Sequence, residues 1–137
     1  MGILLRVLLP TLTAAGLIVD AVVHWTYAPD LAAIEGGVIG GDTLFRVQAV
    51  VAAVAAVAVL VRTRRWTYAV AFVVAAGAVG ALLFYYHVDV GALGPLPAMH
   101  EPVWYPEKTI SLVGEGVAAL AASAGLLLER TRVIPRE

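Results

Sequence analysis

The stretch GLIVDAVVHWTYAPD, residues 16–30, decides the fold because it places two ionisable residues in a segment otherwise apolar enough to enter a lipid bilayer. Asp20 and His24 are four residues apart, so a helix puts both side chains on one face. An ionised residue near the centre of a membrane helix costs at least about 2.5 kcal/mol on insertion scales. We therefore expect Asp20 and His24 to face other helices of the protein and not lipid.

The composition of the whole chain indicates an integral membrane protein. Of the 137 residues, 61% are hydrophobic and only 14% are charged, whereas a soluble domain typically has about 25% charged residues. So few charged residues cannot cover a globular surface, and lipid is the solvent that suits most of the chain. The absence of cysteine excludes disulfides, thiolate metal sites and thiol chemistry.

Four apolar stretches predict an all-α, single-domain bundle of four transmembrane helices. Each stretch is long enough to span, since about 20 residues cross a hydrocarbon core of about 30 Å. The first stretch is read as a retained helix, because no small-residue cleavage pattern interrupts it. The predicted helices are about residues 3–26, 43–62, 66–86 and 107–129, and the predicted outer loops are about residues 27–42 and 87–106.

The distribution of basic residues predicts that both termini are cytoplasmic. Lys and Arg in short segments beside membrane helices favour the cytoplasm. Seven arginines flank the same side of the four helices, namely Arg6, Arg62, Arg64, Arg65, Arg130, Arg132 and Arg136. The opposite side carries the acidic loop residues Asp30, Glu35, Asp42, Asp89 and Glu101. We expect a multi-pass protein of a bacterial-type inner membrane, and because topology explains its arginines, nucleic-acid binding is not indicated.

Small residues at four-residue spacing predict close contacts between helices, because helix association in lipid depends on close packing. Such residues occur at Ala76 and Gly80 in the third predicted helix, and at Gly114, Ala118 and Ala122 in the fourth.

Polar residues in the predicted helices lie on stripes that converge toward the outer end. Thr13, Gly16, Asp20, His24 and Tyr27 share one face of the first helix. A rise of about 1.5 Å per residue from Pro106 places Glu115 about 13 Å deep. We predict a polar pocket opening to the outer face and formed by Asp20, His24, Tyr27, Arg46, Gln48, Lys108, Ser111 and Glu115. The alternative is a purely structural network in which Arg46 and Lys108 pair with Asp20 and Glu115 to lock the helices together.

A second group of candidate ligands lies in the predicted loop 87–106. Histidine combined with carboxylates can bind Zn²⁺ or a related divalent metal ion, and His24 is a candidate additional ligand. The loop candidates are His87, Asp89, His100 and Glu101, although their spacing matches no zinc motif and a solvated loop is the alternative. A haem held by His24 and His87 is a further alternative, because both lie near the outer ends of their helices.

The order of these parts resembles the small DoxX-like four-helix membrane proteins. The resemblance rests on a first helix that ends in a polar residue and an X-Pro loop (His24 to Pro29), on a glycine-bearing outer segment, and on the Thr43-Leu44-Phe45-Arg46 start of the second helix. A tight basic turn and a fourth helix after a long loop complete it. The resemblance implies a four-helix bundle associated with membrane redox or quinone-linked systems, and it supplies no catalytic residue.

Three functions are consistent with these features. The first is a binding or accessory protein whose outer pocket holds a small ligand or ion, or whose polar surface docks a larger membrane complex. The second is an intramembrane enzyme acting on a quinone, isoprenoid or sterol-like molecule, with Asp20 or Glu115 as proton donor or acceptor and His24 as its partner. The third is ion transport by a homo-oligomer, which the scarcity of polar residues in the inner half disfavours.

Overall fold

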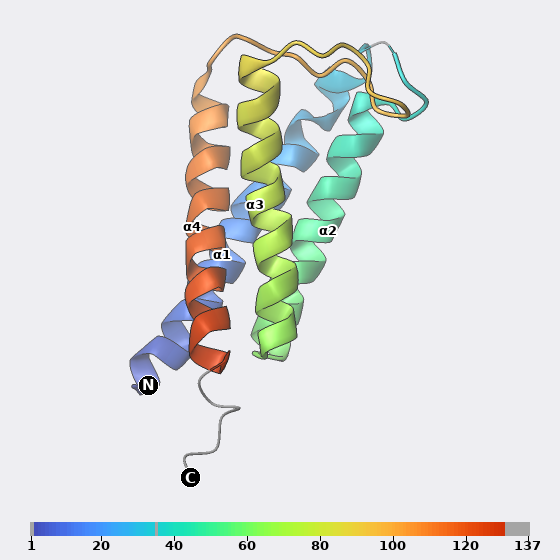
Figure 1. The fold of residues 1–137 in the computed structure, drawn as a ribbon. Coiled ribbons are helices and arrows are strands. Elements are labelled where there is room, and N and C mark those ends of the chain that lie inside the picture. Colours follow the sequence, from blue (N-terminus) through green and yellow to red (C-terminus); the bar gives the residue numbers. More distant parts are fainter. Residues whose placement is uncertain (1, 35, 131–137) are drawn as a thin grey trace.

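The computed structural model describes residues 2–34 and 36–130, and these residues form an all-helical bundle (Figure 1). Every predicted helix is present, with ends that differ from the predicted ones by at most two residues. A short 3-10 helix in the first outer loop was not predicted. The elements are α1 (Ile3–Tyr27), η1 (Ala28–Leu31), α2 (Gly41–Val61), α3 (Arg65–His87) and α4 (Pro106–Arg130).

All four long helices are long and apolar enough to cross a membrane, by length and composition. Their outward faces carry large apolar side chains: Val54 is 63% exposed, Val73 68% and Leu120 74%. Apolar side chains on the exterior of a bundle suit contact with lipid, because exposure of so much apolar surface to water is unfavourable.

The helices alternate in direction, so the helix ends and connecting segments fall into two groups, one at each end of the bundle (Figure 1). The basic end holds the start of α1, the tight turn at residues 62–64 and the end of α4. The loop end is covered by residues 28–34, 36–40 and 88–105. The acidic Glu35 and the basic Arg132 and Arg136 lie outside the described residues.

The four helices pack unevenly around the bundle. α1 contacts both α2 and α4 extensively, and α3 contacts α4 extensively, but the contact between α2 and α3 is smaller. Figure 1 shows α2 and α3 close together at the basic end and diverging toward the loop end. The bundle is therefore closed on the α1–α4 side and looser on the α2–α3 side.

The contact between α1 and α4 depends on glycine. A Cβ atom added to Gly16 would overlap the carbonyl oxygen of Gly114 and the side chain of Ala118. Ala118 and Ala122 have no exposed surface, so the small residues predicted on α4 do lie at a helix contact. Asp20 follows Gly16 by one turn and Glu115 follows Gly114 directly, so this close approach brings the two acidic residues toward one another.

The two loops at the loop end are joined by main-chain hydrogen bonds. The N–H groups of Val38 and Ile39 both donate to the carbonyl oxygen of Pro95, at 2.9 Å each. Gly37 permits this contact, because its φ is +72° and a Cβ atom there would overlap the main chain of Leu96. The loops thus form one cover over the loop end of the bundle.

The glycine contact between α1 and α4 yields a stability prediction. Gly16→Ala should lower the free energy of unfolding by about 1–3 kcal/mol, because an extra methyl group overpacks the interface. The matched control is Gly116→Ala on α4, where an added Cβ meets open space and the expected change is below about 1 kcal/mol. Unfolding in detergent micelles titrated with dodecyl sulfate and followed by circular dichroism measures both. Equal losses in the two variants would contradict the proposed close contact.

Candidate functional site

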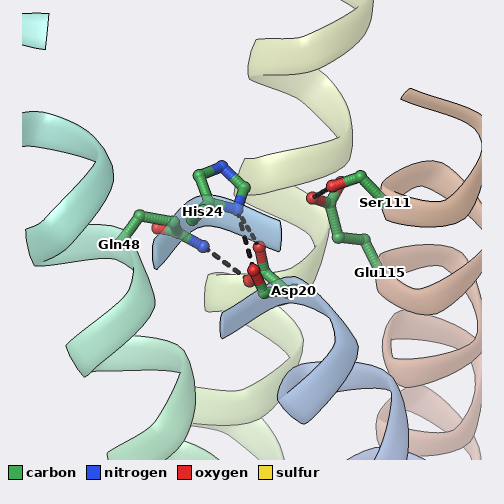
Figure 2. Close-up of polar contacts among 5 residues, drawn as sticks. All are labelled: Asp20, His24, Gln48, Ser111 and Glu115. Carbon is green, nitrogen blue, oxygen red and sulfur yellow. Dashed lines mark hydrogen bonds and ion pairs between the residues drawn. The ribbon is translucent and has the colours of Figure 1, made fainter. Parts of the chain in front are cut away.

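Asp20 on α1 has no exposed surface and is held by two neighbours. Gln48 Nε2 on α2 donates a hydrogen bond to Asp20 Oδ2 at 2.8 Å. His24 Nδ1 lies 2.6 Å from Asp20 Oδ1 and 3.0 Å from the main-chain oxygen of Asp20 (Figure 2). Because a main-chain oxygen only accepts, Nδ1 carries the proton of that hydrogen bond. Asp20 therefore links α1 to α2 and sets the orientation of the His24 ring.

Glu115 on α4 approaches Asp20 from the opposite side. It also has no exposed surface, and its Oε1 accepts a hydrogen bond of 2.6 Å from Ser111 Oγ. Its Oε2 accepts no hydrogen bond from the residues that the structure describes. Figure 2 shows the carboxyl group directed toward Asp20 and His24. One potential ligand atom from each of Asp20, His24 and Glu115 lies within 4.8 Å of the others.

Neither predicted basic partner pairs with these carboxyl groups, so the structure departs from the proposed ion-pair network. Arg46 donates to Asp42 Oδ2 at 3.1 Å, and its side chain is 47% exposed. It follows Asp42 by one turn of α2, and such i,i+4 pairs form on a helix surface without tertiary packing. Arg46 therefore lies outside the polar site in which it was predicted.

Lys108 instead ties the loop of residues 88–105 to the start of α4. Its Nζ donates to the main-chain oxygens of Glu101 at 2.8 Å and Val103 at 2.6 Å. Nζ also lies 5.4 Å from the ring centre of Tyr86 and 4.7 Å from that of Tyr105, within the range of cation–π attraction. Lys108 thus stabilises the aromatic cover above the polar cluster.

Tyr105 shows how this cover affects ionisation. Partial burial of the phenol raises the pKa of Tyr105 above its usual value, and the nearby carboxylates of Glu101, Glu107 and Asp30 raise it further. Tyr105 therefore remains a neutral hydrogen-bonding group at physiological pH.

A cavity of about 760 Å³ connects the polar cluster with the loop end. It lies among α1, α2, α3 and α4 and is lined mainly by apolar and aromatic side chains. Asp20 does not line it but holds two residues that do. The residues predicted for the polar pocket that line it are His24, Tyr27, Gln48, Lys108, Ser111 and Glu115. Two of the predicted metal ligands, His100 and Glu101, line it as well.

The sequence reasoning missed the α3 wall of the cavity. Val73, Gly77, Gly80 and Phe84 line it and include no polar side chain that marks them as site residues. A Cβ atom added to Gly77 or Gly80 would meet open space. The predicted helix contact at Gly80 is therefore wrong, since this glycine borders the cavity. The only signal in the sequence was a pair of glycines three residues apart, which helix packing explains equally well.

The structure does not gather the four loop candidates for a metal ion. Within residues 2–34 and 36–130, the group of His, Asp and Glu residues with ligand atoms close enough for one metal ion is Asp20, His24 and Glu115. The loop candidates make local contacts instead: Asp89 accepts from the N–H of Gly91, His100 Nδ1 lies 2.8 Å from the main-chain oxygen of Tyr85, and Glu101 accepts from the N–H of Val103.

His87 is exposed at the end of α3, and its ring contacts Tyr86 edge-on at 4.8 Å. It does not belong to the described lining of the cavity, whereas His24 does. The two histidines proposed as haem ligands therefore lie in different environments.

Comparisons with protein-family models, curated proteins and solved structures found no match for the chain. The DoxX-like resemblance accordingly stays a prediction.

The hydrogen bond between α2 and α1 predicts unequal effects for two neighbouring side chains. Gln48→Leu leaves Asp20 Oδ2 buried without its donor and should lower the free energy of unfolding by about 1–3 kcal/mol. Arg46→Gln removes an exposed ion pair and should cost less than about 1 kcal/mol. Dodecyl sulfate unfolding of both variants measures the difference. A larger loss of unfolding free energy in Arg46→Gln than in Gln48→Leu would overturn the assignment of Gln48 as the partner of Asp20.

Proposed function

We propose that this protein spans the membrane and binds a lipid-soluble small molecule that carries a polar group. The observation that supports this function is the cavity of about 760 Å³, with apolar walls and a compact polar patch of His24, Gln48, Ser111 and Glu115. Small-molecule sites typically have volumes of about 300–1,000 Å³ and few polar groups within mostly apolar walls. The polar patch would orient the ligand, and the apolar walls would bind its hydrocarbon part.

The uneven packing of the bundle favours a ligand that arrives from lipid. The cavity wall on α3 is open at Gly77 and Gly80. Val47 on α2 and Val73 on α3 also line the cavity while being 54% and 68% exposed. The opposite side is closed by the glycine contact between α1 and α4. A molecule dissolved in the bilayer would therefore enter between α2 and α3.

The polar patch favours a ligand with a hydrogen-bond donor. Glu115 lines the cavity, and its buried Oε2 has no hydrogen-bond donor among the described residues. A buried carboxylate oxygen without a donor is costly, and a hydroxyl group of the ligand would remove that cost. Quinols, isoprenoid alcohols and sterols combine such a hydroxyl group with a large apolar body.

A second candidate function is acid–base catalysis on the same class of molecule. The observation that favours it is the His24 ring, which lines the cavity while Asp20 holds its Nδ1 at 2.6 Å. A carboxylate that orients a histidine in this way supports proton transfer at the other ring nitrogen. Conversion of a bound isoprenoid alcohol by wild-type protein, lost in His24→Gln with binding retained, would separate an enzyme from a binding protein.

In the proposed orientation, both termini lie on the cytoplasmic side of a bacterial-type inner membrane. The basic end carries Arg6, Arg62, Arg64 and Arg65, and the loop end carries the acidic loop residues, in agreement with the positive-inside rule.

Because the chain contains no cysteine, single cysteines can report this orientation. Asp89→Cys in the second outer loop should react with a membrane-impermeant maleimide on intact cells. Arg64→Cys in the tight turn, also exposed, should react only after the membrane is permeabilised. Gel-shift detection of the labelled protein measures both. Labelling of Arg64→Cys on intact cells, with none of Asp89→Cys, would reverse the proposed orientation.

Ligand binding can be tested by filling the cavity from its open wall. Gly80→Leu places a side chain into the cavity, whereas Gly116→Leu on α4 places the same side chain into open space outside the described cavity lining. Farnesol and decylubiquinol serve as probes, and retention by the purified protein is quantified by mass spectrometry after gel filtration. We expect wild type and Gly116→Leu to retain at least one probe, and Gly80→Leu to retain at least about ten-fold less, because the added side chain occupies ligand volume.

Equal retention by Gly80→Leu and Gly116→Leu would place the bound probe outside the cavity. Failure of the wild-type protein to retain either probe would reject these two ligand classes.

A further inference from the structure

The polar cluster combines three side chains of the types that bind transition metals. Asp20 and His24 come from α1 and Glu115 from α4, and one potential ligand atom of each lies within 4.8 Å of the others. One imidazole and two carboxylates form a donor set that suits Zn²⁺ and also Mn²⁺ or Fe²⁺. The histidine distinguishes the cluster from a group of acidic residues alone.

The hydrogen bonds around the cluster hold one oxygen of each carboxylate and leave the other available. Gln48 donates to Asp20 Oδ2, and Ser111 donates to Glu115 Oε1. Asp20 Oδ1 lies against His24 Nδ1, yet neither it nor Glu115 Oε2 accepts a hydrogen bond from the described residues. Both residues have no exposed surface. Outer hydrogen bonds of this kind orient the carboxylate ligands of metal ions.

The charges of the cluster also suit a divalent cation. Metal ligation requires both carboxyl groups ionised and the imidazole neutral. In that state the cluster carries two negative charges, which one divalent ion balances. Arg46 and Lys108 are engaged with Asp42 and with main-chain oxygens instead. Buried charges require such compensation, because an unpaired charge is strongly unfavourable in an apolar interior.

We propose that Asp20, His24 and Glu115 bind one divalent metal ion, with Zn²⁺ as the best fit. Zn²⁺ binds such nitrogen and oxygen atoms at about 2.0–2.2 Å, so the three side chains would draw together slightly around it. The ion binds His24 Nδ1 in place of the ring proton, which moves to Nε2 so that the imidazole stays neutral. Three protein ligands leave a fourth position, and His24 and Glu115 line the cavity from which that position is reached. This inference extends beyond the binding of a lipid-soluble molecule and does not depend on it.

Zinc titration of the untagged full-length chain in detergent tests the proposal. The protein is stripped with a chelator, titrated with Zn²⁺, and its bound metal is counted by mass spectrometry after gel filtration. We expect one Zn²⁺ per wild-type chain, and binding weaker by at least about 100-fold in Asp20→Asn and Glu115→Gln. The control His87→Gln removes an exposed histidine outside the described cavity lining and should bind as wild type does. Co²⁺ should give the intense visible absorption of a four-coordinate site in wild type and lose it in Glu115→Gln.

Two further variants keep the test decisive if the ligand variants do not fold. Ser111→Ala and Gln48→Leu retain all three ligands and should weaken Zn²⁺ binding by about 10- to 100-fold. If stripped wild-type protein binds none of Zn²⁺, Mn²⁺ and Co²⁺, the proposal is overturned. The charges of the two carboxylates would then be neutralised by bound protons. Zn²⁺ binding unchanged in Glu115→Gln, or in both Ser111→Ala and Gln48→Leu, would also overturn it. Gly80→Leu should keep its Zn²⁺, so loss of the lipid-soluble probe and loss of the metal are distinguishable.

Discussion

The burial of Asp20 and Glu115 is the constraint on which the arrangement of this bundle depends. A carboxyl group inside an apolar bundle needs hydrogen-bond donors or counter-charges, because lipid supplies neither. Asp20 obtains a donor from Gln48 across the contact between α1 and α2, and Glu115 obtains one from Ser111 on its own helix. The contact of Gly16 with Gly114 then brings α1 and α4 close enough for the two acidic residues to share one site.

The cavity follows from the same arrangement. α1 uses its polar stripe and its glycine to contact α2 and α4, whereas the contact between α2 and α3 is smaller. Gly77 and Gly80 place no side chain in the space beside α3, and α2 and α3 diverge toward the loop end (Figure 1). The two loops cover that end, and Lys108 holds the second of them in place. The proposed binding site thus lies where the bundle packs least tightly, beside the residues that are most costly to bury.

Parts of the site were predictable because they depend on a single helix. Asp20 and His24 share a face through their four-residue spacing, and the depth of Glu115 follows from the helical rise. Arg46 was placed incorrectly for a related reason. The charge of Arg46 suited Asp20, but Asp42 lies one turn away on the same helix. Arg46 and Asp42 can therefore pair without any tertiary packing. Gln48, which is neutral, makes the contact with Asp20 that was expected of a charged residue.

The sequence by itself determined the number of helices, their approximate ends, the polar faces of α1 and α4, and the gathering of arginines at one end. These features follow from hydrophobicity, helical periodicity and chain length, which act along one segment at a time. Only the tertiary structure decided that Gln48 is the partner of Asp20, that Gly80 borders a cavity, and that Asp20, His24 and Glu115 lie within 4.8 Å of one another. Periodicity relates residues on one helix, whereas the rotation and separation of neighbouring helices depend on how side chains from different helices fit together.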